Sequence, residues 1–233
     1  MLKLIKSNQK NFLAKLDIVL KKRKLKDSKI DLKVKRIIKD VKKNKDLALI
    51  KYEKKYSNIR NISLKNIKFS ALEKKEIIRR LDKKTKHSID IAFERILNFH
   101  KKQKLSSFFF TDKFKNSFSY KISAITRVGV YVPGGLASYP SSVLMNCIPA
   151  LVAGVKEIYM TTPSMSKSYN PAVVYAAQKC KVKEIYKIGG AQAIAAMAYG
   201  TKTIQKVDKI VGPGNAFVAN AKKQVFGEVG IDM

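Results

Sequence analysis

Three polar residues lie where predicted strands in the second half of the chain end or lead into helices. Tyr131 ends one strand, and Gln192 and Asn215 each begin the helix that follows another strand. Because ligands bind outside the carboxyl ends of the strands in an open parallel sheet, all three side chains should face one crevice. An aromatic ring and two amides suit the base, ribose and amide groups of a nucleotide and do not suit proton transfer. We therefore predict a nucleotide site at Tyr131, Gln192 and Asn215, although each alone could be structural and Asn215 could cap its helix.

Four turns are expected at this edge of the sheet. Three contain glycines, which let a backbone approach a ligand closely, and three lead directly into helix N-termini, whose free N–H groups favour phosphate. None is a G-x-G-x-x-G fingerprint, and no acidic residue stands about 20 residues beyond the first turn to bind a ribose. A conventional dinucleotide fingerprint is therefore absent, and a purely structural role for the turns stays open. The turns cover residues 132–135, 161–163, 189–192 and 212–215.

The remaining reactive residue types form no catalytic or metal-binding set. His87 and His100 have no ligand partners at metal spacing. Cys147 and Cys180 form no CxxC pair and lie in apolar helical patterns, so we expect them to be buried and reduced. We therefore predict no catalytic residue and no metal ligand in this sequence. The cysteine usage and the lack of a secretory signal favour the cytoplasm.

Alternating strands and helices from residue 127 onward predict an α/β fold. The order is βαβαβαβα, with crossovers long enough for parallel pairing and strands rich in β-branched residues. Such strands suit a Rossmann-like parallel sheet with helices on both faces, preceded by a helical N-terminal region. The expected strands are residues 128–132, 157–161, 184–188 and 207–211, and the expected helices are residues 141–155, 171–180, 192–199 and 215–226.

The first hundred residues carry helical patterns, and residues 106–130 change character. An apolar stripe runs from Val34 to Val41 at helical spacing, residues 70–73 (SALE) form a capping box, and further stripes reach Leu97. The stripes that follow the capping box fit one long helix or two with a break near residues 84–88. Residues 106–130 predict one or two short strands. A sheet that buries their aromatic rings is favoured over the alternative that the rings stack on nucleic-acid bases. The aromatic residues there are Phe108, Phe109, Phe110, Phe114, Phe118 and Tyr120.

The charge of the chain is strongly positive and unevenly distributed. The 233 residues contain 49 Lys and Arg against 17 Asp and Glu, a formal net charge of +32. Residues 1–120 hold 36 basic and 12 acidic residues, a net of +24, and residues 121–233 hold 13 and 5, a net of +8. Only 7 of the 49 basic residues are Arg, the side chain that forms bidentate contacts with guanine and phosphate. A surplus of Lys, Ile and Asn from an AT-biased genome therefore explains the charge better than a nucleic-acid partner. No apolar run reaches the ~18 residues of a membrane helix, so no membrane partner is expected.

The motifs of the second half, in this order and spacing, resemble histidinol dehydrogenase. They are residues 127–135 (RVGVYVPGG), 188–196 (IGGAQAIAA), 211–215 (VGPGN) and 230–233 (GIDM). The resemblance is dense from about Ile125 to the last residue and looser before residue 120. It implies a zinc-dependent homodimer with two Rossmann-like halves that lack the usual fingerprint, and NAD-dependent oxidation of L-histidinol to L-histidine through the aldehyde. The NAD contacts of the family map by motif onto Tyr131, Gln192 and Asn215, and Tyr56 falls where the family tends to have an aromatic residue near the cofactor.

The chain departs from the family pattern at its end. In the family the zinc ligands and the Glu-His acid–base pair follow the GIDM motif, whereas this sequence ends at Met233 and has no histidine after His100. We therefore expect an N-terminal part of the enzyme, inactive alone, that exposes apolar surface around Phe108 to Phe118. The expected organisation is a helical N-terminal region (1–105), short strands connecting to an incomplete first α/β unit (106–130) and a Rossmann-like NAD-binding unit (131–233). A basic nucleic-acid-binding protein and a non-catalytic nucleotide-binding regulator are the alternatives.

Overall fold

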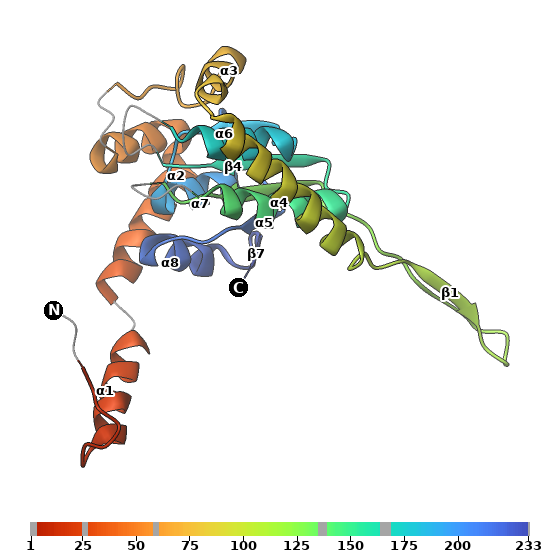
Figure 1. Cartoon of the computed structure of the whole chain (residues 1–233), viewed down its shortest axis with the longest axis horizontal. Helices are drawn as coiled ribbons and strands as arrows, with labels where there is room; N and C mark the ends of the chain where they lie inside the picture. The colour runs from red at the N-terminus through yellow and green to blue at the C-terminus, as the bar shows by residue number, and fades with distance from the viewer. Residues whose placement is uncertain (1–3, 25–27, 58–60, 135–138, 164–168, 233) are drawn as a thin grey trace.

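A five-stranded parallel sheet forms the centre of the molecule (Figure 1). The computed structural model describes residues 4–24, 28–57, 61–134, 139–163 and 169–232. The strand order is β5-β4-β3-β6-β7, and every neighbouring pair is parallel. Strands β4 and β5 therefore follow β3 on one side of the sheet, and β6 and β7 lie on its other side, so the strand order reverses between β3 and β6. The strands are β3 (Arg127–Tyr131), β4 (Glu157–Thr161), β5 (Glu184–Tyr186), β6 (Lys209–Val211) and β7 (Gly230–Ile231).

The predicted alternation of strands and helices is confirmed, with small shifts in the boundaries. Helices α5 (Pro140–Val152), α6 (Pro171–Lys179), α7 (Gly190–Tyr199) and α8 (Ala216–Val225) follow β3 to β6 in turn. Strand β7 is additional to the predicted set and pairs with β6 at the edge of the sheet. Gly135 and Met233, which belong to the quoted motifs, lie outside the described residues.

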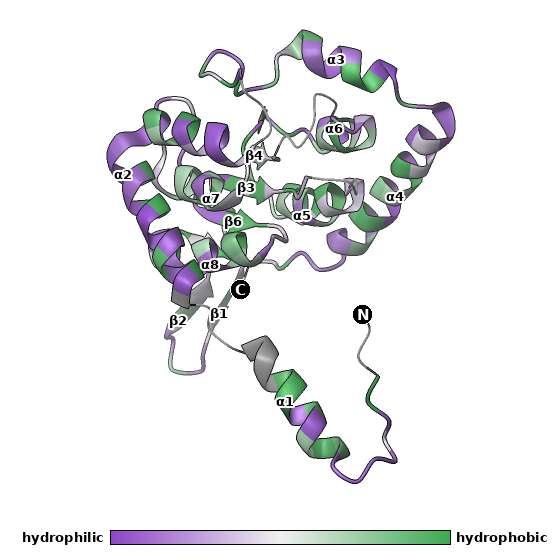
Figure 2. Cartoon of the chain, turned by 90° about the vertical axis from the view of Figure 1, so that its left-hand side faces the viewer, coloured by the Kyte–Doolittle hydropathy of each residue, from purple (hydrophilic) through white to green (hydrophobic). Residues whose placement is uncertain are grey.

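One face of the sheet is covered by α7 and α8, with α2 (Ser28–Tyr56) packed outside them (Figure 2). The predicted stripe from Val34 to Val41 is buried in this layer. Along β3, Tyr131 points into this layer, and Gly129 allows α7 to approach the strand closely. A Cβ atom at residue 129 would lie 2.6 Å from Met197 Sδ, so a larger residue would force the Met197 side chain to shift.

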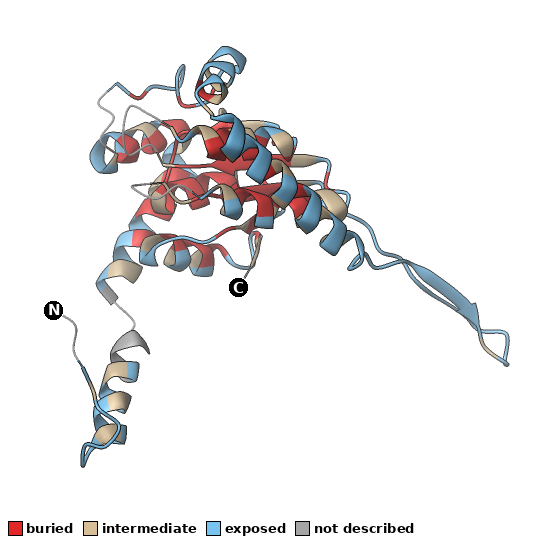
Figure 3. Ribbon diagram, in the orientation of Figure 1, coloured by how far each residue is buried: buried red, intermediate tan, exposed pale blue. Residues whose placement is uncertain are grey.

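The opposite face is covered by α5 and α6, with α3 (Ala71–Arg79) and α4 (Lys83–Lys101) packed outside them. Val128 and Val130 of β3 point into this layer, as expected from the alternation of side chains along a strand. Cys147 and Cys180 are both buried here as free thiols. Figure 3 shows that the buried residues concentrate in the sheet and the helices next to it.

Helix α2 consists of two arms that meet at a kink. Lys45 has φ 48° and ψ −125°, a sparsely populated conformation that costs a residue other than glycine about 1–3 kcal/mol. Its ammonium group donates hydrogen bonds to the carbonyl oxygens of Tyr199 and Gly200, at 3.3 and 3.0 Å, where α7 ends. These bonds satisfy carbonyls that the helix leaves free. Asp40 on the first arm accepts hydrogen bonds from Lys51 and Tyr52 on the second, at 2.8 and 2.9 Å, which ties the arms together.

Helices α3 and α4 are separate, with a break at residues 80–82, slightly before the predicted position. Asp82 caps α4 by accepting a hydrogen bond from the Thr85 N–H at 2.8 Å. Ser70 caps α3 by accepting one from the Glu73 N–H at 3.0 Å. The reciprocal half of the capping box differs from the prediction, because the Glu73 carboxylate instead accepts hydrogen bonds from Lys187 at 2.5 and 2.7 Å.

Residues 108–120 form an antiparallel hairpin that projects from the body of the molecule (Figures 1 and 3). Its strands are β1 (Phe108–Thr111) and β2 (Ser117–Tyr120), and every residue of both strands is exposed. The expectation that a sheet buries these aromatic rings is wrong, because the two strands pair only with each other. The rings stack within the hairpin, as Phe110 does on Phe118 with centroids 5.1 Å apart. The expectation of exposed apolar surface around Phe108 to Phe118 agrees with this arrangement.

The N-terminal helices pack directly on the helices that cover the sheet, α2 on α7 and α8, and α4 on α5 (Figure 2). Helix α1 (Phe12–Lys24) lies apart from this body. The division of the chain at residues 105 and 130 stays a prediction. In the part of the chain that the structure describes, no helix is both long enough and apolar enough to cross a bilayer.

Candidate nucleotide-binding site

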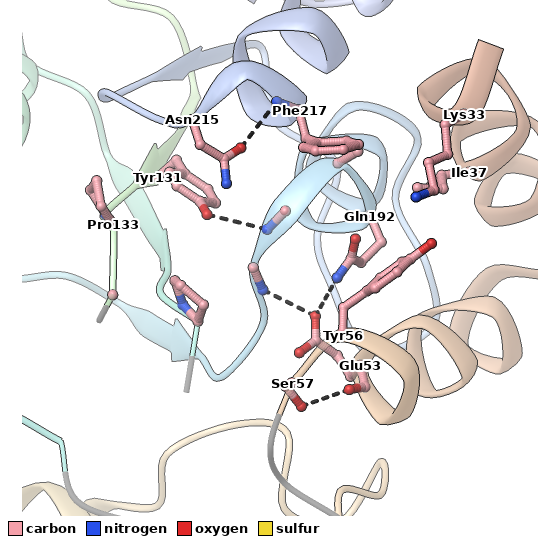
Figure 4. Close-up of a pocket in the computed structure, with 15 residues that line it drawn as sticks. Lys33, Ile37, Glu53, Tyr56, Ser57, Tyr131, Pro133, Gln192, Asn215 and Phe217 are labelled. Carbon is pink, nitrogen blue, oxygen red and sulfur yellow. Dashed lines mark hydrogen bonds between the residues drawn. The ribbon is translucent and has the colours of Figure 1, made fainter. Parts of the chain in front are cut away.

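A cavity of about 390 Å³ lies outside the carboxyl ends of the strands. This volume falls within the range of small-molecule sites. The cavity is lined by residues from both arms of α2, from the segments after β3, β4 and β5, and from the start of α8, among them Tyr131, Gln192 and Asn215 (Figure 4). The structure thus brings the three predicted residues together, beside the point where the strand order reverses. That is where open α/β sheets bind their ligands.

Tyr131 is the last residue of β3 and is almost fully buried. Its hydroxyl oxygen accepts a hydrogen bond from the Gly190 N–H at 3.2 Å, at the first residue of α7. Burial raises the pKa of Tyr131, and the nearby Glu53 carboxylate raises it further. The phenol therefore stays protonated, and its own O–H remains able to donate a hydrogen bond.

Gln192 lies in the first turn of α7 and is buried, with 3% of its surface exposed. Its side-chain Nε2 donates a hydrogen bond to Glu53 Oε1 at 2.8 Å. The same oxygen accepts a hydrogen bond from the Gly189 N–H at 3.1 Å. The amide is therefore fixed in one orientation, and this orientation depends on a residue of α2.

Glu53 is a site residue that the sequence analysis missed. It is 1% exposed and lines the cavity between Tyr56 and the Gly189 turn (Figure 4). Burial raises the pKa of this carboxyl, although the hydrogen bonds from Gln192 and Gly189 act in the opposite direction. The sequence does carry a signal for it. Glu53 stands four residues after Leu49 and one after Tyr52, so it occupies a position on the apolar face of the helix where an apolar residue is expected.

Asn215 caps α8, as the structural alternative for this residue predicts. Its Oδ1 accepts hydrogen bonds from the N–H groups of Phe217 and Val218, both at 3.1 Å. The cap uses only the oxygen of the amide. In the described part of the chain Nδ2 has no hydrogen-bond partner, so it remains available as a donor on the cavity side (Figure 4). The capping and ligand-binding roles are therefore compatible.

The turn that carries Asn215 is held by an ion-pair network around Gly212. Gly212 has φ +110°, and a Cβ atom there would lie 2.1 Å from the Tyr131 carbonyl oxygen, so only glycine fits. The Gly212 N–H donates to Asp232 Oδ2 at 2.7 Å. Buried Lys222 of α8 donates to Asp232 Oδ1 at 2.5 Å and to the Gly212 carbonyl. Asp232 of the GIDM motif thus positions the VGPGN turn.

The start of α7 differs from the expected phosphate site. Its Gly189 and Gly190 N–H groups are occupied by Glu53 and Tyr131 rather than free. Positive charge enters the cavity instead from Lys33 on the first arm of α2. Lys33 also lies over the Phe217 ring, with Nζ 5.7 Å from the centroid. The cavity therefore has a cation on one arm of α2 and a carboxylate on the other.

Tyr56 lines the cavity at the end of α2, on the side of Glu53 (Figure 4). It is partly exposed and stacks parallel to Tyr52, with ring centroids 6.0 Å apart. An exposed aromatic face of this kind can stack on a base or on a nicotinamide ring. The structure therefore places Tyr56 at the cavity, and its position near a bound cofactor stays a prediction.

The residues that line the cavity suit a nucleotide, whereas the described residues offer no ligand set for zinc. The cavity offers an amide donor at Asn215, a phenol at Tyr131, a carboxylate at Glu53 and a cation at Lys33, which suit the polar groups of a nucleotide. By contrast, no group of three or more His, Cys, Asp and Glu side chains that could hold a metal ion occurs among the described residues. His87 is exposed on α4.

The strand order and the cavity beside its reversal are those of Rossmann-like nucleotide-binding α/β proteins. Residues 20–233 match the model of the histidinol dehydrogenase family. The chain is 54% identical over 232 residues to the histidinol dehydrogenase of Pelagibacter ubique, and the aligned region covers 100% of this chain and 53% of that protein. It is 45% identical over 223 residues to that of Nitrosomonas europaea, covering 96% and 52%. The chain therefore belongs to the histidinol dehydrogenase family, whose members are NAD-dependent oxidoreductases of histidine biosynthesis that also use zinc.

The fold agrees with this assignment. The crystal structure of histidinol dehydrogenase from Elizabethkingia anophelis superposes with a TM-score of 0.84 at 37% identity, over 90% of this chain and 48% of that one. The chain thus spans about half the length of the curated relatives that it matches.

Proposed function

We propose that this chain supplies the NAD-binding part of a histidinol dehydrogenase, which oxidises L-histidinol to L-histidine through the aldehyde. The observation that carries the proposal is the convergence of Tyr131, Gln192 and Asn215, from three separate strand–helix junctions, on one cavity. The resemblance to the family assigns NAD contacts to the same three positions. NAD, when bound, accepts the hydride.

The work of the cavity residues is to bind and orient the nucleotide. Asn215 Nδ2 would donate to an acceptor of the nucleotide, while its Oδ1 keeps α8 capped. The Tyr131 O–H would donate to the nucleotide as well, because its oxygen already accepts from Gly190. Two amides and a phenol of raised pKa are poor general bases near neutral pH, so we propose no proton-transfer role for them. We expect this chain alone to bind NAD without forming NADH from histidinol.

Zinc belongs to the family, and the described residues offer no ligand set for it. No step of the proposal therefore uses it. Homodimer assembly and a cytoplasmic setting are likewise part of the proposal. The hairpin supports the dimer, since a projecting group of six exposed aromatic rings is typical of a surface that another protein covers.

The substitution Asn215→Asp tests the proposal. It keeps Oδ1 as the cap of α8 and replaces the amide donor with a second oxygen of negative charge. We expect NAD affinity, measured by isothermal titration calorimetry on the 233-residue chain, to fall by about tenfold or more, since a donor is lost and an anion faces the nucleotide phosphates.

The matched control is Asn170→Asp, which makes the same chemical change at the cap of α6. There Asn170 Oδ1 accepts from the Ala172 N–H at 2.8 Å, and this residue does not line the cavity. Equal losses of NAD affinity in both variants, or no NAD binding by the unmodified chain, would contradict the proposal.

A further inference from the structure

The second strand of the nucleotide-binding half lacks the acidic residue that usually reads the ribose. In Rossmann folds a carboxylate about 20 residues after the first glycine turn binds the 2′-hydroxyl of the adenosine ribose. Here the residues that end and follow β4 are Thr161, Thr162 and Pro163, and no Asp or Glu occurs between Glu157 and Glu184. The sheet itself therefore supplies no carboxylate at this position.

A carboxylate reaches the same edge of the sheet from α2. Glu53 lines the cavity beside the turn after β5, and α2 can place it there because the kink at Lys45 redirects the second arm. One carboxylate oxygen, Oε1, is occupied by Gln192 and Gly189. The other, Oε2, has no hydrogen-bond partner in the described part of the chain, so it keeps its capacity to accept from a ligand.

We propose that Glu53 reads the 2′-hydroxyl of the adenosine ribose and thereby makes the site selective for NAD over NADP. This inference rests on the proposed function. The free Oε2 would accept the ribose hydroxyl in a charge-assisted hydrogen bond. The 2′-phosphate of NADP would instead bring an anion against a buried carboxylate. Among the described residues, Lys33 is the other charged side chain that lines the cavity, and it lies on the first arm of α2, where it can attract the pyrophosphate.

The alternative role for Glu53 is purely structural, as the acceptor that orients Gln192 and the Gly189 turn. The substitution Glu53→Gln separates the two roles. Glutamine keeps an oxygen that can accept from Gln192 and Gly189, and it removes the negative charge and places an amide donor where Oε2 was. A structural role predicts little change in the preference between the two nucleotides. A ribose-reading role predicts weaker NAD binding and stronger NADP binding.

The test measures dissociation constants for NAD and NADP with the full chain, its Glu53→Gln variant and a Glu76→Gln control. Glu76 lies on α3, is exposed and does not line the cavity, so its substitution removes one charge outside the site. We expect the unmodified chain and the control to prefer NAD, and the Glu53→Gln variant to lose about 10- to 100-fold of that preference. An unchanged preference in a folded Glu53→Gln variant would overturn the inference while leaving NAD binding itself intact.

A second measurement needs no variant and decides the question if Glu53→Gln does not fold. NAD that lacks only the 2′-hydroxyl of its adenosine ribose should bind the unmodified chain about tenfold or more weakly than NAD. Equal affinity for the two ligands would refute a ribose-reading role. If the unmodified chain binds neither NAD nor NADP, the proposed function fails, and this inference fails with it.

Discussion

Lys222 is the residue whose loss should most directly loosen the turn that carries Asn215. Its side chain is 7% exposed, and its ammonium group joins the Asp232 carboxylate to the Gly212 carbonyl. The substitution Lys222→Met preserves most of the volume and the apolar stem. It leaves the Gly212 carbonyl without its donor and the Asp232 carboxylate without its counter-ion.

The expected destabilisation follows from the exposure of the two partners. Breaking a fully buried ion pair costs about 3–5 kcal/mol, because an unpaired charge stays behind. The Asp232 side chain is 34% exposed and keeps its hydrogen bond from the Gly212 N–H, so water compensates part of that loss. We therefore expect the free energy of unfolding to fall by about 1.5–3 kcal/mol, the range of a single charged hydrogen bond.

Urea denaturation of the full chain, followed by circular dichroism, measures this change. Lys223→Met is the matched control, since the neighbouring lysine is exposed on the same helix and its loss should change stability by no more than about 0.5 kcal/mol. The double variant Lys222→Met with Asp232→Asn should lose less than the sum of the two single variants. Strict additivity, or a Lys222→Met effect equal to that of the control, would refute the network. NAD affinity should fall in Lys222→Met and not in the control.

Two further predictions concern the kink and the hairpin. Hydrogen bonds from Lys51, Asn44 and Tyr52 lower the pKa of Asp40 from 3.8 to about 2. Because the pKa of Asp40 is lower in the folded state, its ionised carboxylate stabilises the fold at pH values above 3.8, and this contribution disappears as the pH falls from 3.8 towards about 2. The substitution Asp40→Asn should remove that part of the acid sensitivity, measured by denaturation at a series of pH values. At the hairpin, the double substitution Phe109→Ser with Phe114→Ser should leave the stability of the monomer unchanged, because both rings are exposed, and should weaken self-association measured by light scattering. An unaltered mass distribution would remove the hairpin from the proposed dimer interface.

The sequence predicted the sheet well because periodicity and turn chemistry are local signals. Each predicted strand from residue 128 onward has an observed counterpart, and the junction residues Tyr131, Gln192 and Asn215 follow from strand ends alone. The short strands predicted within residues 106–130 were located correctly, but the prediction that their aromatic rings are buried was wrong. Alternating aromatic residues indicate a strand, while burial depends on whether another surface covers that strand.

The contribution of α2 could not be predicted from the same signals. The helical pattern runs through Lys45 without a glycine or proline, so nothing local marks the kink. The kink depends instead on tertiary contacts, namely the bonds from Lys45 to the end of α7 and the Asp40 contacts between the two arms. A straight helix would place Lys33 and Glu53 about 30 Å apart. Only the folded chain brings both to one cavity.

The burial of Glu53 is better explained by ligand binding than by stability. A carboxylate that is 1% exposed, with no cation paired to it in the described part of the chain, costs the fold desolvation energy, and its raised pKa reflects that cost. Glutamine at the same position could accept the bonds from Gln192 and Gly189 without a charge. Stability alone would therefore favour the amide. A charge kept at the edge of a cavity despite this cost is typical of functional sites, where residues that serve a ligand reduce stability. Glu53 retains its proton to higher pH in the folded chain than in the unfolded chain. The unmodified chain should therefore become progressively less stable than a Glu53→Gln variant as the pH rises above 4.5, the ordinary pKa of the group.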